Sequence, residues 1–172
     1  MLSLARIKNR LIAKVITRFP SFGKGLIEIY KPWETQGIPW APVQKPLAES
    51  IGALITTAGV HRKDQKPFDM IDRNGDPTYR EIDNDTIAEE LMITHDYYDH
   101  TDAQKDINIV FPIRRLQEFA GEGIIGGIAH THYGFMGHID GPHIYTLMNE
   151  SAPEVAAHLH RQGVDCVLLT PG

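Results

Sequence analysis

The sequence predicts an α/β fold with a mostly parallel sheet and helices on both faces, flavodoxin-like or Rossmann-like, after an irregular Pro-rich N-terminal arm. Two observations lead to this prediction. Short, nearly continuous apolar runs are typical of strands in a parallel sheet that is covered on both faces. Amphipathic helical patterns separate these runs in the second half of the chain, so that strands and helices alternate there.

Composition narrows the class of protein further. The 172 residues are 42% hydrophobic and 23% charged, which suits one ordinary domain and excludes a disordered tail, a collagen-like repeat and a coiled coil. The single cysteine, Cys166, excludes an internal disulfide framework and a Cys-based zinc site, and it favours the cytoplasm. The net charge of −5 disfavours a nucleic-acid binder, and no window is apolar enough to span a bilayer.

The chain begins with a strongly basic segment. Residues 1–27 hold six basic residues and no acid, whereas the remainder holds 11 basic and 22 acidic residues. Leu4, Ile7, Leu11 and Val15 follow helical spacing, which predicts a basic amphipathic helix ending near Phe19-Pro20. We expect this helix to pack on its own acidic domain or on a partner, and a membrane-surface role is the less favoured alternative.

Five prolines between residues 20 and 46 predict an extended arm, because proline fits neither a helix interior nor a central strand. Trp33 and Trp40 are expected to pin this arm by apolar contact. We therefore assign residues 1–50 to the basic helix and arm, and residues 51–172 to the α/β domain.

The α/β domain is predicted to contain four buried strands and two helices. The strands are Ile51–Ala58, Leu91–Thr94, Ile124–Ala129 and Val164–Thr170. The helices are Pro112–Ala120 and Ser151–Gln162, the second with Ser151 as its N-cap and Gly163 as its C-cap.

Histidines follow three of the predicted strands. In an open parallel sheet, functional groups gather beyond the C-terminal ends of the strands, so His61, His95, His130 and His132 are expected to share one crevice. Acid–base or substrate-binding histidines without a metal are the favoured interpretation. A metal held by His130, His132 and His138, with Asp99 or Asp140, is an alternative, as are hydrogen-bonded loop histidines.

Other polar residues are candidates for substrate binding. Tyr98 and Asp99 lie in a dense polar block, and Arg114 begins a helix, from which a guanidinium can hold a carboxylate. Arg80 is a weaker candidate of the same kind, and Cys166, inside a predicted strand, is expected to be unreactive. The absence of GxSxG and P-loop motifs disfavours serine hydrolases and NTPases.

Several segments together resemble one protein family. These segments follow one another in a fixed order: Thr56–His61, Pro67–Asp69, Gly75–Arg80, His95–Asp99, Asp106–Leu116 and Gly123–Gly126. On this ordered set, the chain resembles over residues 35–172 the selenoprotein B subunits of glycine, sarcosine, betaine and D-proline reductases.

This resemblance implies reductive cleavage of a carbon–nitrogen bond in a small amino acid or amine, with dithiols as electron donors. It implies a selenocysteine or cysteine just after Gly172, a pyruvoyl group on a partner subunit, and a homo- or hetero-oligomer. A histidine at position 61, 95, 130 or 132 would lower the pKa of the selenol or thiol, or protonate the leaving amine. Because that redox centre lies outside the 172 residues, we expect no reductase activity from them alone.

Two other classes of function are considered beside the reductase. One is a non-catalytic α/β subunit or binding module that presents a polar crevice to a partner. The other is a small metal-dependent hydrolase that uses the histidine cluster.

Overall fold

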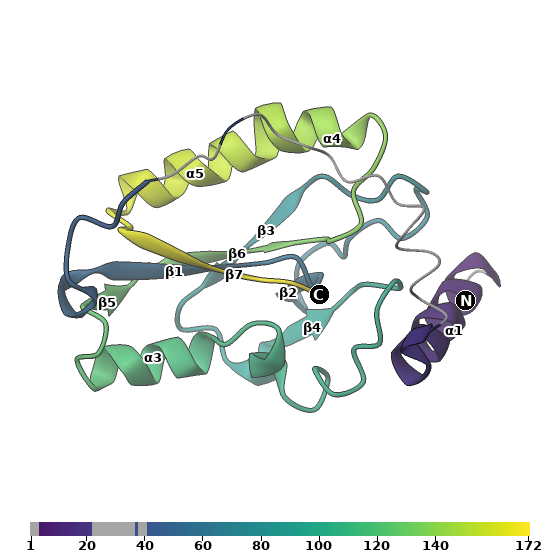
Figure 1. The fold of residues 1–172 in the computed structure, drawn as a ribbon, viewed down its shortest axis with the longest axis horizontal. Coiled ribbons are helices and arrows are strands. Elements are labelled where there is room, and N and C mark those ends of the chain that lie inside the picture. Colours follow the sequence, from purple (N-terminus) through teal and green to yellow (C-terminus); the bar gives the residue numbers. More distant parts are fainter. Residues whose placement is uncertain (1–3, 22–36, 38–40) are drawn as a thin grey trace. The chain divides into compact units, whose positions relative to one another are not determined.

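The computed structural model describes residues 4–21, 37 and 41–172. The chain divides into two compact units: the N-terminal unit, Met1–Val43 with Asp96–Asp99, and the sheet unit, Gln44–His95 with His100–Gly172. Figure 1 labels the elements of both. The predicted contacts of Trp33 and Trp40 lie outside the described residues.

The N-terminal unit contains the predicted basic helix, α1 (Leu4–Arg18), which confirms the helical spacing found in the sequence. Arg6 Nε lies 2.5 Å and Arg10 Nε 3.0 Å from the carboxylate oxygens of Asp96, whose side chain is 1% exposed. These ion pairs fix one face of α1 within the unit. None of the described helices is long and apolar enough to cross a membrane.

The main sheet is built around β1 (Ile51–Thr56). On one side β1 pairs in parallel with β7 (Cys166–Thr170). On the other side it pairs in parallel first with β5 (Gly127–Ile128) and then with β6 (Thr131–Phe135). β3 (Tyr79–Asp83) completes this side as the antiparallel neighbour of β6. The prediction of a mostly parallel sheet in a mixed α/β fold is therefore confirmed.

The helices α3 (Ile113–Gly121) and α5 (Ala152–Arg161) confirm the two predicted helices, and they lie on opposite sides of the sheet (Figure 1). Val155 and Leu159 of α5 are buried against Ala53, Tyr133 and Phe135, which form one core of the sheet unit. This apolar contact explains why the apolar residues of α5 recur at helical spacing in the sequence.

The start of the second helix differs from the prediction. Ser151 has helical backbone angles and makes no side-chain cap, because α4 (His143–Thr146) and a π-helical turn (Leu147–Ser151) lead directly into α5. The π-helical turn ends two residues before Pro153, whose missing N–H and ring would disturb a regular α-helix. The predicted end is confirmed, since Gly163 follows the helix with a φ of 70°.

The predicted strand at residues 91–94 exists, but it is not part of the main sheet. β4 (Leu91–Ile93) pairs antiparallel with β2 (Val60–Arg62) in a separate two-stranded sheet. The expectation of four parallel strands in one sheet is wrong at this position. Short 3₁₀ helices cover Leu47–Glu49, Ala88–Glu90 and Ile107–Ile109.

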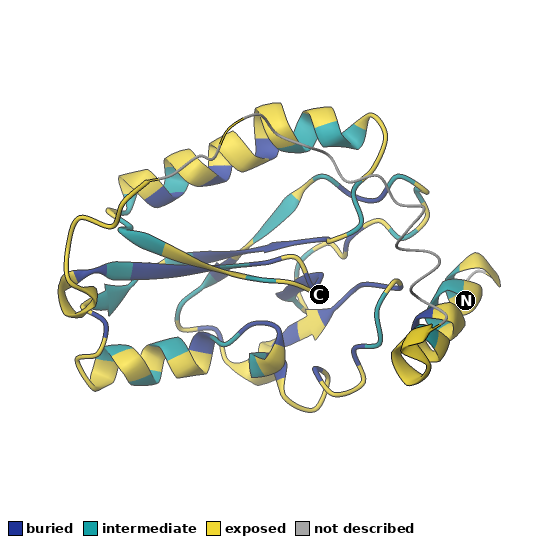
Figure 2. Cartoon of the chain, in the orientation of Figure 1, coloured by how far each residue is buried: buried dark blue, intermediate teal, exposed yellow. Residues whose placement is uncertain are grey.

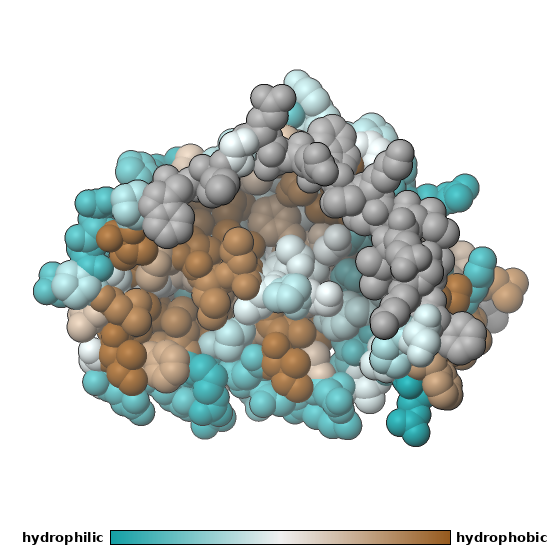
Figure 3. Space-filling model, viewed as in Figure 1, coloured by the Kyte–Doolittle hydropathy of each residue, from teal (hydrophilic) through white to brown (hydrophobic). Residues whose placement is uncertain are grey.

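β7 is the edge of the main sheet among the strands that the structure describes, since it pairs with β1 alone. Val167, Leu168 and Leu169 are exposed, in contrast to the buried β1 beside them (Figure 2). Apolar surface accordingly lies along this strand in the space-filling view (Figure 3). Cys166 begins the strand half-buried, and burial raises the pKa of its thiol.

Candidate active site

The turn Thr57–Gly59, directly after β1, is held by three different strands. Thr57 N donates to Thr170 O at the end of β7 (3.0 Å), and Gly59 N donates to Phe135 O at the end of β6 (2.9 Å). Gly59 O in turn accepts from Thr94 N, just after β4 (2.9 Å). This turn therefore joins the C-terminal ends of β1, β6 and β7, which is where ligands bind in open α/β sheets.

Gly59 allows this close approach. Its φ is +73°, and a Cβ at this position would lie 2.4 Å from Thr94 O. Both the backbone angle and the lack of space require glycine. The turn is thus a compact backbone platform for the residues that follow β4.

His95 packs on this platform. The residue is 4% exposed, its Cβ lies beside Gly59, and a Cβ added to Gly137 would lie 3.4 Å from His95 Nε2. His95 O accepts a hydrogen bond from His100 Nε2 at 3.1 Å. The His95 imidazole is therefore held in a confined position between two glycines at the C-terminal edge of the sheet.

The end of β7 returns to the same turn. A Cβ added to Gly172 would lie only 2.6 Å from Ala58 Cα, so Gly172 is packed directly against Ala58. Gly172 and His95 thus both contact the Thr57–Gly59 turn. The sequence predicted that His130 lies in the crevice at this same edge, and this prediction is wrong, as His130 lies elsewhere.

His61 lies on β2 with both ring nitrogens engaged. Nδ1 donates to Arg62 O (2.7 Å), so Nε2 accepts from the hydroxyl of Thr94 (2.8 Å). The ring is fully buried, and desolvation lowers the pKa of His61 below its usual value. This arrangement favours a neutral imidazole that positions Thr94, and hence the neighbouring His95.

His132 is inside the sheet rather than beyond a strand end. It lies within β6, fully buried, and its Nδ1 accepts the backbone N–H of Leu54 at 3.0 Å. Burial lowers the pKa of His132 to about 4. Among the described residues Nε2 has no hydrogen-bond partner, and the ring centroid lies 6.2 Å from that of Phe111.

His130 lies at the opposite edge of the sheet. It precedes β6, and the neighbouring Ala129 N donates to Gly52 O near the start of β1. The expectation that all four histidines share one edge is therefore wrong: His61 and His95 meet near Thr94, whereas His130 and His132 do not join them. The error arises because β6 begins only after His130.

The structure also separates the three candidate metal ligands. His138 lies in the loop after β6, where its Nε2 contacts Arg73 O (2.9 Å), whereas His132 is buried within the strand and His130 precedes it. Within the described residues, no three His, Cys, Asp or Glu side chains are close enough to hold a metal ion. The metal site proposed from these histidines is thus not assembled.

The candidate substrate-binding residues occupy two different places. Tyr98 and Asp99 belong to the N-terminal unit, and burial raises the pKa of the Tyr98 phenol. Arg114 is exposed on α3 and lies 3.6 Å from Glu118. Arg80 is held by Lys66 O (2.7 Å) and stacks over the ring of Phe68 at 4.4 Å, which favours a structural role.

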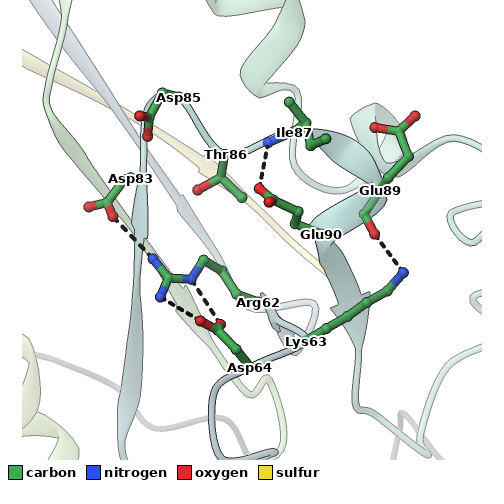
Figure 4. A pocket seen from close by; sticks show the side chains of 9 residues that line it. All are labelled: Arg62, Lys63, Asp64, Asp83, Asp85, Thr86, Ile87, Glu89 and Glu90. Atoms are coloured by element: carbon green, nitrogen blue, oxygen red, sulfur yellow. Dashed lines mark hydrogen bonds and ion pairs between the residues drawn. The ribbon is translucent and has the colours of Figure 1, made fainter.

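An open pocket of about 620 Å³ lies near β2, but it contains none of the predicted site residues. Figure 4 shows its side chains, in which Arg62 is paired with Asp64 (3.0 Å) and Asp83 (3.1 Å). Its charged groups are two cations and five acids, so the pocket repels an anionic ligand. The full lining is Arg62, Lys63, Asp64, Asp83, Asp85, Thr86, Ile87, Glu89 and Glu90.

Sequence reasoning missed the residues that confine His95. Gly137 is not among the candidates found in the sequence, and Thr94 appears there only as the end of a predicted strand. Their role depends on contacts between segments that are far apart in the chain. For example, a Cβ added to Gly137 would lie 2.8 Å from Thr57 O. The Gly-rich composition after β6 was the one available signal of such a close approach.

Comparison with known proteins resolves the family. The model of the family described as glycine/sarcosine/betaine reductase selenoprotein B matches residues 28–172. The chain belongs to this family. Two of the segments that carried the resemblance, Thr56–His61 and His95–Asp99, begin at the edge where Gly172 packs on Ala58. No solved structure matches the chain.

Two curated relatives come from the same group of reductases. The chain is 41% identical over 150 residues to D-proline reductase subunit gamma of Acetoanaerobium sticklandii, covering 87% of this chain and 60% of the relative. It is 29% identical over 136 residues to glycine reductase complex component B subunit gamma of Symbiobacterium thermophilum, covering 77% of this chain and 31% of the relative. The chain thus spans less than two thirds of the length of either relative.

Proposed function

We propose that this chain forms part of a selenocysteine- or cysteine-dependent reductase that cleaves a carbon–nitrogen bond in a small amino acid or amine. The observation that supports this most strongly is the packing of Gly172 and His95 on the same turn at the C-terminal edge of the sheet. Membership of the selenoprotein B family supports a reductase as the class of enzyme. The name of the 41% identical relative makes D-proline the first substrate to test.

The reducing selenium or sulfur atom is proposed to act beside Gly172. When present, this atom supplies the nucleophile for cleavage and the connection to the dithiol donor. We propose that this edge suits such an atom, because Gly172 and His95 pack on the same turn, which would bring the atom near an imidazole. In its protonated form, His95 would lower the pKa of the selenol or thiol at this edge.

The electrons and protons of the overall reaction balance with a dithiol as the reductant. Cleavage of the C–N bond consumes two electrons, which a dithiol supplies as it becomes a disulfide. One proton is added to carbon and one to the leaving nitrogen. His95 is proposed to hold and deliver the proton that nitrogen receives, while His61 and Thr94 keep His95 in place.

The second reactive group is proposed to come from a partner. A pyruvoyl group on another subunit would supply a carbonyl that activates the substrate nitrogen, and no residue of this chain is assigned to it. Both curated relatives are named as subunits, which supports a hetero-oligomeric assembly. Tyr98 and Asp99 belong to a different unit from Arg114, so the three are not assigned to one substrate site. Dithiol chemistry supports the cytoplasm as the proposed compartment.

The test is reductase activity of the assembled protein. We would express the chain, extended past Gly172 by its natural downstream residues, with the reductase subunits encoded beside it, and supply dithiothreitol. D-proline, glycine, sarcosine and betaine would be compared by NMR detection of the cleaved product. The proposal requires cleavage of at least one substrate.

Two histidine variants locate the reaction in the fold. We expect His95→Gln to lower kcat by about 10²-fold, the usual contribution of a general acid. His130→Gln is the matched control, because His130 lies at the opposite edge, and it should stay within twofold of the parent. Equal losses for both variants, or no cleavage at all, would contradict the proposal.

A further inference from the structure

Helix α1 turns its polar face inward. Arg6, Arg10 and Ala13 follow one another at spacings of four and three, so they lie on one face of the helix. Both arginines pair with the buried Asp96, and Ala13 is the buried residue of the helix among those described. This is the face by which α1 is held within its own unit.

The apolar stripe of α1 lies on the other side. Leu4, Ile7, Leu11 and Val15 are spaced by three or four residues and are 87%, 52%, 62% and 42% exposed. At 100° per residue, the centre of this stripe is roughly opposite the face of Arg6, Arg10 and Ala13. A helix at the surface of a folded domain normally has the reverse orientation, with its apolar stripe on the core.

Charge narrows the choice of partner. Lys8, Lys14 and Arg18 are exposed around the stripe, and α1 contains no acidic residue. A second copy of α1 would bring the same cations together, which is unfavourable for a symmetric pair. An apolar groove with an acidic rim complements both the stripe and its charges.

We propose that the stripe of α1 docks into an acid-rimmed apolar groove on another subunit of the reductase complex. This inference rests on the proposed function in so far as a multi-subunit reductase supplies the partner. The helix lies outside residues 28–172, the part that matches the family, so the docking helix is separate from the shared part of the fold. An anionic membrane is the competing partner, and it is treated as an outcome of the test.

The experiment measures assembly with purified, identified subunits. The reductase subunits encoded beside the chain are titrated with the full chain by isothermal calorimetry. We expect Ile7→Gln with Leu11→Gln to weaken binding at least tenfold, because glutamine preserves helix propensity but removes the apolar contact. Ile71→Gln, at an exposed apolar residue of the sheet unit (86% exposed), is the matched control and should bind like the parent.

A charge-reversal variant tests the acidic rim. Lys8→Glu with Lys14→Glu should also weaken binding at least tenfold and should reduce its dependence on salt concentration. Circular dichroism of each variant verifies that α1 remains helical. If the charge reversal lowers the helical content, the double variant Lys8→Gln with Lys14→Gln provides the same test, with a smaller expected loss of binding.

The outcomes separate this inference from the proposed function. Unchanged assembly with Ile7→Gln and Leu11→Gln would overturn the docking proposal, whatever the activity of the complex. So would dimerisation of the chain through the stripe, or stripe-dependent binding to phosphatidylglycerol vesicles in place of the subunits. A complex that assembles through α1 but cleaves no substrate would uphold the docking and contradict the proposed function.

Discussion

His132 Nδ1 accepts the backbone N–H of Leu54 at 3.0 Å, so a side chain takes the place of a strand carbonyl between β1 and β6. This contact fixes the tautomer of the ring: the nitrogen that accepts is unprotonated, and the proton is on Nε2. Because the ring is fully buried, a second proton would place an unpaired charge inside the sheet. The folded protein therefore keeps His132 neutral.

The first prediction concerns the pH dependence of stability. The pKa of His132 is about 4 in the folded chain, whereas the ordinary value is 6.5. As the pH falls, His132 takes up its second ring proton in the unfolded chain before it does so in the folded chain. The free energy of unfolding should therefore fall as the pH drops from 6.5 to 4 and level off below pH 4. The loss from this group is on the order of 3 kcal/mol.

His132→Asn tests this prediction, since the asparagine oxygen can accept from Leu54 N–H and does not titrate in this range. The free energies of unfolding of the parent chain and of His132→Asn would be measured with urea between pH 4 and 7. The difference between them should shrink towards low pH. A constant difference across that range would show that His132 is not the group responsible.

The second prediction concerns the contact between β6 and β2. A Cβ added to Gly134 would lie 2.0 Å from Val60 O, so Gly134→Ala forces two backbone segments apart. We expect a loss of about 2–4 kcal/mol in the free energy of unfolding. Gly127→Ala in β5 is the matched control, because no atom of the described residues lies within 4 Å of the added Cβ. Similar losses in both variants would contradict the proposed backbone contact.

The third prediction concerns the exposed edge of the sheet. Leu169 on β7 is 69% exposed, and an apolar edge strand without a charge is prone to pair with other chains. Leu169→Lys should reduce aggregation of the purified chain, measured by light scattering over a concentration series. Ile71→Lys, at a residue that is even more exposed (86%) but lies away from the edge, should change aggregation less. Equal effects would mean that general solubility, and not the edge, decides aggregation.

The sequence predicted elements with continuous apolar runs or helical periodicity, such as β1, β7 and α5, because local pattern and burial agree there. It did not predict β6, whose Thr131–Phe135 contains histidine and glycine and follows a glycine-rich turn. The predicted strand Ile124–Ala129 is reduced to Gly127–Ile128, since the apolar side chain of Ile125 fills the space beside Gly52 instead. Missing β6 is what misplaced His130 and His132.

The candidate site was only partly predictable for the same reason. His95 and the segment after β1 were identified because strand ends in a parallel sheet collect functional groups. The confinement of His95 by Gly59 and Gly137 depends on tertiary contacts between segments that are far apart in the chain. Sequence spacing carries no information about such contacts.

The central claim is that His95 acts on a selenium or sulfur atom beside Gly172. Its most direct test is the pKa of a cysteine placed immediately after Gly172 in the extended chain, measured from the pH dependence of its alkylation. Cys166→Ala removes the native thiol, whose pKa is raised by burial, from the measurement. We predict a thiol pKa below the ordinary value of about 8.5, rising by about one unit with His95→Gln and unchanged with His130→Gln. An ordinary pKa that His95→Gln leaves unchanged would contradict the account.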